Sequence, residues 1–437
     1  MKYSSIFIPI VTTSLWAGQL VAQSIDPLVL SSNSLFPILT QSPSDPLQSN
    51  FAGALSISEI PPPNNPDRLE TKKVYYVPNG PWGDLEYYVT YLQMPQAWMN
   101  YLEIPSDRTL WHFRENEIDQ IVALLADSGI SELNGLPWAE QGDFHKIPSK
   151  PGLSFAPNRE LSLALNSSER KKLSEILTRV ETNKSYTDPV IIESGDAVSW
   201  YREAGLNEEL VQLIAKLCYK QGESLVFSDS PLVLSTLPSL DERKKFLRST
   251  SRTRTLVLRL NIGNGDEYRE IADYWTAGHK RKAIIPILDS IAETPGVERI
   301  DIAHLLPPTP RKLLYTYPDL EDYLYIGNRD CHWTSANFFR SSPNGVQPES
   351  ILTEILNSEY EPATGELSYG DMIVLKDAPL NLVIHSAIYI AGDIVFTKNG
   401  KERLSPWILM RYSDMERRYK RDRNIVTSVF RLKENNE

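Results

Sequence analysis

The most informative stretch of this chain reads Asn328-Arg329-Asp330-Cys331-His332-Trp333-Thr334, and a strand pattern that contains His385 follows downstream. A short helix is expected to begin at Cys331. A helix N-terminus and a neighbouring imidazole both lower the pKa of a thiol, and the thiolate is the reactive form. The stretch therefore predicts a thiol nucleophile at Cys331 and a base at His385.

The residues that follow predict a helix, a polar loop and then several strands. The helix is expected over 331–340, and its apolar face would begin with Cys331 and continue through Ser335, Phe338 and Phe339. The strands are predicted at 371–375, 383–390, 394–398 and 425–432. This order favours an α+β fold class for the C-terminal part of the chain.

Three motifs in this part resemble the NlpC-like branch of the papain-like cysteine peptidases. They are the pair Asp330-Cys331, the strand start Gly370-Asp371-Met372-Ile373-Val374, and the strand His385-Ser386-Ala387-Ile388-Tyr389-Ile390. The resemblance implies a papain-like domain over 311–437, in which the helix carrying Cys331 packs on an antiparallel sheet. It also implies thiol-dependent hydrolysis of an amide, in a cell-wall peptide or in another peptide or isopeptide.

The resemblance gives Cys331 the role of nucleophile and His385 the role of general base, and it implies a third polar group that orients the imidazole. A three-residue turn at 391–393 would return the next strand antiparallel and set Asn399 opposite His385. Asn399 is preferred, because its amide oxygen can accept from the imidazole, and Thr397 is the alternative. A two-residue turn would put Lys398 on that face instead.

For the oxyanion, the backbone N–H of Cys331 is expected to donate, with Tyr323 or Tyr325 as the second donor by loose resemblance to the family. The chain has His332-Trp333 where the family has Ser-Gly. His332 is interpreted as a surface or capping residue, because adjacent helix residues point in different directions.

The rest of the chain is divided by composition. Residues 1–22 are typical of a secretory signal peptide and 23–67 of a Pro- and Ser-rich linker. Residues 68–310 are expected to form a mixed α/β region of unknown role. We therefore expect export to the periplasm, the cell envelope or the medium, with no membrane span after signal cleavage.

The middle region contains clear local signals. Asn166 with Glu169 is typical of a capping box, and Asn207 is expected to cap a second helix. A small α/β unit is predicted further on, with strands at 255–262 and 299–305 and helices at 266–276 and 281–293.

Composition argues against several other functions. The net charge of -11 argues against a nucleic-acid binder, and the short basic stretch at 416–423 is interpreted as a solvated helix end. The 6 histidines show no metal-site spacing, so neither a metal nor another cofactor is predicted. The 2 cysteines do not make a disulfide framework. Cys218 is predicted to be a buried core thiol, and a Cys218–Cys331 bridge, which would abolish the nucleophile, is the alternative.

A second function of a different class is also consistent with these patterns. In it, a degenerate papain-like module binds a cell-envelope ligand or protein partner without chemistry, and the middle region provides the main binding surface. The reactivity of the Cys331 thiol separates the two hypotheses. The sequence carries no signal for an oligomeric state.

Overall fold

The computed structural model describes most of the chain from Lys73 onward. The described residues are 73–100, 104–105, 107–127, 132–133, 136–137, 142–146, 153–262, 267–277, 281–319, 329–343, 349–400, 405–421 and 423–433. The predicted signal peptide and linker lie outside these residues, as do Tyr323 and Tyr325. No helix in the described ranges has the length and apolar character needed to cross a membrane.

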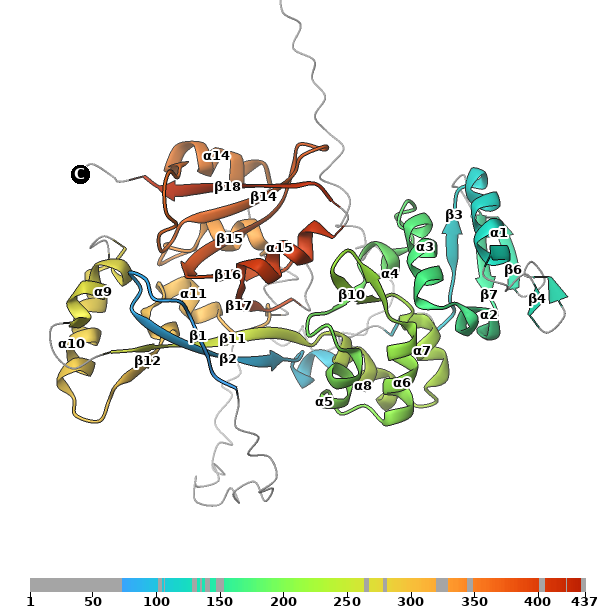
Figure 1. Ribbon diagram of the computed structural model, residues 1–437, viewed down its shortest axis with the longest axis horizontal. Coiled ribbons are helices and arrows are strands. Elements are labelled where there is room, and N and C mark those ends of the chain that lie inside the picture. The colour runs from blue at the N-terminus through green and yellow to red at the C-terminus, as the bar shows by residue number, and fades with distance from the viewer. Residues whose placement is uncertain are drawn as a thin grey trace, which may run out of the picture. The chain divides into compact units, whose positions relative to one another are not determined.

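The C-terminal part contains a six-stranded antiparallel sheet with the strand order β13-β18-β14-β15-β16-β17 (Figure 1). Its strands are β13 (Tyr360–Pro362), β14 (Met372–Asp377), β15 (Leu382–Ala391), β16 (Ile394–Lys398), β17 (Trp407–Arg411) and β18 (Ile425–Leu432). All four predicted strands are present, and β13 and β17 were not predicted. The α+β fold class is confirmed at this level.

The two faces of this sheet are covered by different helices. On one face, α13 (Cys331–Ala336) and α14 (Glu349–Glu359) share a core with Ile388 and Phe396. On the other face, α15 (Tyr412–Lys420) packs against Ala387 and Val395. Successive side chains of β15 and β16 point to opposite faces of the sheet, so each of these strands contributes to both cores.

Helix α13 begins at Cys331, as predicted. The Asp330 carboxylate accepts a hydrogen bond from the Trp333 amide at 2.8 Å, which satisfies one donor of the first turn. The helix ends at Ala336, four residues before the predicted end at Arg340, and turns follow. All six of its residues are buried, so it has no solvent-facing side.

A second sheet crosses the middle region in the order β1-β2-β11-β12. Its strands are β1 (Tyr75–Tyr76), β2 (Asp84–Leu92), β11 (Thr253–Asn261) and β12 (Arg299–Asp301). The predicted helices are α9 (Glu267–Trp275) and α10 (Ile285–Glu293). The predicted strand at 299–305 ends early, because the Asp301 side chain caps the 3-10 helix η7 (Ile302–Leu305).

The remaining elements of the middle region are mostly short helices. The capping box at Asn166 and Glu169 and the Asn207 cap are both present. The helices are α1 (Ile118–Asp127), α2 (Arg159–Ala164), α3 (Ser167–Leu177), α4 (Lys184–Thr187), α5 (Ala197–Glu203), α6 (Glu208–Leu217), α7 (Ser230–Thr236), α8 (Leu240–Thr250) and α11 (Pro308–Leu313). The short strands are β3 (Trp111–Phe113), β4 (Glu132–Leu133), β5 (Leu136–Pro137), β6 (Gly142–Lys146), β7 (Leu153–Pro157), β8 (Val190–Ile192), β9 (Tyr219–Gln221) and β10 (Ser224–Phe227).

One hydrophobic core joins the middle region to the C-terminal sheet. It includes Leu258 of β11 and Trp275 of α9 together with Trp333 and Phe396. The Thr255 hydroxyl also donates to the Leu409 carbonyl at 3.0 Å and accepts from the Leu409 amide at 3.2 Å. This core crosses the predicted boundary between 310 and 311, and the domain division stays a prediction.

Gly370 precedes β14 with a φ of +92°, and a Cβ there would overlap the ring of Phe339. We expect Gly370→Ala to lower the free energy of unfolding by about 1–3 kcal/mol more than a matched glycine substitution does, because of this overpacking. The matched control is Gly365→Ala, where φ is +89° and a Cβ would meet no described atom within 4 Å. Urea denaturation of both variants measures the difference, and equal losses would contradict the role of Phe339.

Candidate functional site

The fold brings the Cys331 thiol together with two imidazoles. Cys331 is 5% exposed at the start of α13, and His385 is 0% exposed on β15, on which α13 packs. Burial by itself would raise the pKa of the Cys331 thiol. Charge attraction and hydrogen bonding from His332 and His385 outweigh burial and hold that pKa well below its ordinary value. The arrangement therefore favours a thiolate.

A hydroxyl group determines which nitrogen of His385 carries the proton. Thr397 Oγ1 lies 3.0 Å from His385 Nε2 and donates to the Ser386 carbonyl at 3.2 Å. A hydroxyl has one hydrogen and a carbonyl can only accept, so the contact with the ring requires that Nε2–H donates to Thr397. In the neutral ring, Nδ1 is then the basic nitrogen. It is buried and, apart from the Cys331 thiol, has no hydrogen-bond partner among the described residues, so the proton that it exchanges is that of the thiol.

Tyr419 of α15 covers the His385 ring. The two rings are stacked, with centroids 4.1 Å apart and an angle of 17° between their planes. Burial raises the pKa of the Tyr419 hydroxyl, and the neighbouring Cys331 thiolate raises it further. Tyr419 therefore shields the imidazole from water as a neutral phenol. The sequence analysis did not identify it, because a tyrosine in a charged helix carries no local signal for this role.

Asn399 does not orient the imidazole. The predicted register is present, since Ile388 pairs with Phe396 and Tyr389 with Val395. The turn itself has two residues and not three, because Ala391 pairs with Ile394 and a bulge between Tyr389 and Ala391 shifts the register. However, β16 ends at Lys398, and the Asn399 amide contacts Met410 Sδ at 3.5 Å and accepts from Tyr419 at 3.5 Å. Thr397, the alternative, reaches the ring as a diagonal cross-strand neighbour.

The interpretation of His332 as a surface or capping residue is wrong. It is buried, and its Nδ1 lies 3.0 Å from the Ser386 hydroxyl, which donates to the Cys331 carbonyl at 3.2 Å. The Ser386 hydroxyl has one hydrogen, which it donates to that carbonyl, so His332 Nδ1–H donates to Ser386. The reason is that α13 is short and fully buried, so its second residue also faces the protein interior.

The two cysteines are both free, so the alternative of a Cys218–Cys331 disulfide is wrong. Cys218 is the residue that caps the C-terminus of α6, and its thiol donates to the Ile214 carbonyl at 3.2 Å. Burial raises its pKa to about 12. Cys218 is thus the buried core thiol that the sequence predicts.

The amide of Cys331 is the first of its helix and has no intrahelical acceptor, so it remains the expected oxyanion donor. The predicted second donors lie outside the described residues. Among the described residues, no group of three or more His, Cys, Asp or Glu side chains could hold a metal ion.

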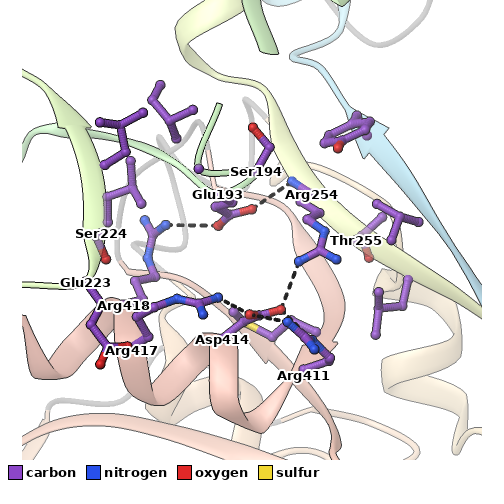
Figure 2. Close-up of a pocket in the computed structure, with 18 of the residues that line it drawn as sticks. Glu193, Ser194, Glu223, Ser224, Arg254, Thr255, Arg411, Asp414, Arg417 and Arg418 are labelled. Atoms are coloured by element: carbon purple, nitrogen blue, oxygen red, sulfur yellow. Dashed lines mark hydrogen bonds and ion pairs between the residues drawn. The ribbon is translucent and has the colours of Figure 1, made fainter. Parts of the chain in front are cut away.

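Two cavities lie beside the site. The larger, of about 500 Å³, is surrounded by charged side chains of α15 and its neighbours (Figure 2). The smaller, of about 290 Å³, is lined in part by Asn399. Cys331 and His385 line neither of them. Asn399 and Tyr419 therefore form the polar connection between the smaller cavity and the His385 ring.

Comparisons with protein-family models, with curated proteins and with solved structures find no match for this chain. The chemistry of the site is therefore inferred from its own geometry.

We expect iodoacetamide to alkylate Cys331 at a lower pH than it alkylates an ordinary thiol, because the lowered pKa makes Cys331 a thiolate at lower pH. Cys218 is the internal control, since a pKa of about 12 keeps it protonated and unreactive. Mass spectrometry of the two cysteine-containing peptides measures both rates. A Cys331 rate that rises about tenfold per pH unit, as for an ordinary thiol, would contradict the lowered pKa.

We expect Thr397→Val to raise the pKa of Cys331 by about one unit, because the imidazolium loses the acceptor of its Nε2–H. The sign follows from the ion pair: a less stable imidazolium stabilises the thiolate less, so the alkylation profile moves to higher pH. Thr397→Ser, which keeps the hydroxyl, and Asn399→Ala, which does not touch the ring, are the controls. A larger shift for Asn399→Ala than for Thr397→Val would assign the orienting role to Asn399.

Proposed function

We propose that this chain is a thiol-dependent amide hydrolase in which Cys331 is the nucleophile, His385 the general base and Thr397 the orienting residue. One observation carries the proposal. Thr397 Oγ1 lies 3.0 Å from Nε2 of the imidazole that lowers the thiol pKa, and the tautomer with its proton on Nε2 leaves Nδ1 basic. A cysteine and histidine buried only for packing would not require this tautomer.

The geometry supports a two-step acyl transfer. Proton transfer from the Cys331 thiol to His385 Nδ1 gives a thiolate and an imidazolium, whose Nε2–H still donates to Thr397. The thiolate attacks the amide carbon, and the imidazolium then protonates the leaving amine as a thioester forms. Water, deprotonated by His385, attacks the thioester and releases the acid and the Cys331 thiol. The Cys331 amide at the helix start is placed to stabilise the oxyanion of each step.

The NlpC-like resemblance supports the same proposal. A helix that carries the cysteine packs on an antiparallel sheet that carries the histidine. Asp371 of the Gly-Asp motif is buried and forms a two-point ion pair with Arg431, at 2.8 and 2.7 Å, which ties the start of β14 to β18. We therefore propose a papain-like arrangement and, as substrate, a peptide amide or isopeptide of the cell envelope, cleaved by an exported protein.

A second candidate function is favoured by the closure of the site. Cys331 is 5% exposed, and the cavities are lined by neither Cys331 nor His385. A module that binds a ligand or protein partner in these cavities, without chemistry at the thiol, would have this form. Amide hydrolysis is the first choice because simple binding leaves the lowered thiol pKa without a role.

We expect Cys331→Ala and His385→Ala to lower kcat/KM for peptide amide hydrolysis by about 10³-fold or more, because the nucleophile and its base act as a unit. A panel of fluorogenic peptide amides and cell-envelope peptides provides the substrates. Cys218→Ser is the matched control and should retain full activity.

The same panel separates the two functions. A peptide carrying a thiol-reactive electrophile should form one adduct, on Cys331, which intact-mass measurement detects. If the native protein forms no adduct and turns over no member of the panel, while Cys331→Ala binds a ligand as tightly as the native protein, the binding module is the correct function.

A further inference from the structure

The larger cavity is built by segments that are far apart in the sequence. Its wall combines the loop after β8, strands β2, β10, β11 and β17, and helix α15. Its charged, serine and threonine lining residues are Glu193, Ser194, Glu223, Ser224, Arg254, Thr255, Arg411, Asp414, Arg417 and Arg418 (Figure 2). Four guanidinium groups thus face three carboxylates. The cavity is positively charged although the whole chain is acidic.

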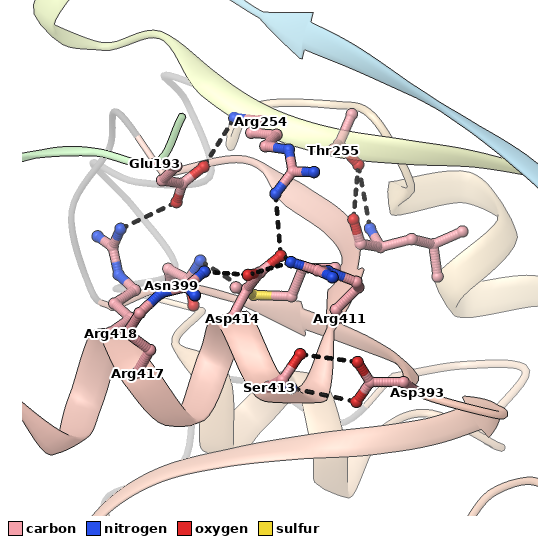
Figure 3. A network of polar contacts seen from close by, with 12 residues as sticks. Glu193, Arg254, Thr255, Asp393, Asn399, Arg411, Ser413, Asp414, Arg417 and Arg418 are labelled. Carbon is pink, nitrogen blue, oxygen red and sulfur yellow. Dashed lines mark hydrogen bonds and ion pairs between the residues drawn. The ribbon is translucent and has the colours of Figure 1, made fainter. Parts of the chain in front are cut away.

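Asp414 is surrounded by three of these arginines (Figure 3). Arg254 donates to it at 2.9 Å, Arg411 binds it through two contacts at 2.9 and 2.8 Å, and Arg417 donates as well. Each guanidinium has five N–H donors, whereas one carboxylate offers about four acceptor positions. Most donors of the three arginines are therefore not bound by Asp414.

The exposed fractions show which partner faces the cavity. The side chains of Arg411 and Arg417 are each 36% exposed, while that of Asp414 is 12% exposed. The carboxylate is therefore covered by guanidinium groups. One Arg–Asp pair would suffice to hold α15 against β17, and additional cations around the same carboxylate repel one another. This arrangement is more suitable for an anion site than for a structural clamp.

Arg418 connects this cavity with the candidate active site. It binds Glu193 at 3.1 Å, and these two residues and Ile191 line both cavities. The next residue along α15 is Tyr419, which stacks on His385. A ligand that spans both cavities would therefore lie along α15 toward Asn399 and Tyr419. Arg417 and Arg418 lie in the last turn of α15, as the sequence predicts, and in addition they line the larger cavity.

We propose that the larger cavity binds a side-chain or terminal carboxylate of an acidic peptide and thereby selects the substrate of the adjacent thiol site. The substrate role rests on the proposed function, whereas the binding of a carboxylate does not. Guanidinium groups bind carboxylates in a planar two-point geometry, and α15 presents Arg417 in the partly covered setting in which such contacts are strongest.

The test compares Arg417→Gln with Lys420→Gln in the full chain. Lys420 is on the same helix and exposed, and it lines neither cavity, so its variant loses the same charge outside the site. Titration calorimetry with an oligoglutamate peptide at low salt measures affinity, and oligoglutamine is the uncharged probe. We expect Arg417→Gln to weaken oligoglutamate binding about tenfold and Lys420→Gln to leave it within about twofold. Arg417→Lys keeps the positive charge but cannot make two parallel contacts with a carboxylate, so its affinity should be intermediate. This variant provides the test if Arg417→Gln does not fold.

Three outcomes would overturn the proposal: equal binding by Arg417→Gln and Lys420→Gln, equal binding of oligoglutamine and oligoglutamate, or phosphate binding tighter than the peptide. Iodoacetamide labelling of the same preparations tests the thiol site separately. A reactive Cys331 without Arg417-dependent binding refutes the carboxylate site alone. An unreactive Cys331 with such binding refutes the hydrolase and supports the carboxylate site.

Discussion

The hydrogen bond from the Thr397 hydroxyl to the Ser386 carbonyl is the contact on which the site depends. A carbonyl cannot donate, so this bond consumes the only hydrogen of the hydroxyl and obliges His385 to donate from Nε2. Strand pairing between β15 and β16 holds both groups in place. The chemical state of the ring is therefore a consequence of sheet register, and Tyr419 stabilises it by keeping water away.

Strand alternation on β15 organises the rest of the site. The side chain of His385 faces Tyr419 of α15, while the next side chain, Ser386, contacts α13. The Ser386 hydroxyl is bonded in the same way as that of Thr397: it donates to a carbonyl, that of Cys331, and accepts from an imidazole, that of His332. Ser386 thus acts on both imidazoles: its hydroxyl contacts His332, and its carbonyl accepts the hydrogen of Thr397, which contacts His385.

The two cysteines show how strongly these imidazoles act. Both thiols are buried, and burial alone raises the pKa of a thiol, as it does for Cys218. At Cys331, the opposite result requires positive charge close to the sulfur, supplied by His332 and His385. In the cavity along α15, opposite charges also meet in a partly buried place, because the covered Asp414 carboxylate binds arginines that line the cavity. Its far wall comes from the middle region, which is tied to β17 through Thr255.

Local signals in the sequence determined the start of the cysteine helix, the strand that carries His385, the capping box at Asn166, the Asn207 cap and the register of the β15–β16 pair, because each depends on residues close in the chain. Tertiary structure decided the rest. Thr397 replaces Asn399 because β16 ends one residue too early, and His332 is buried because α13 has no solvent face. Tyr419 and the arginine cavity come from segments that meet only through long-range packing, so their roles depend on distances that no local pattern encodes.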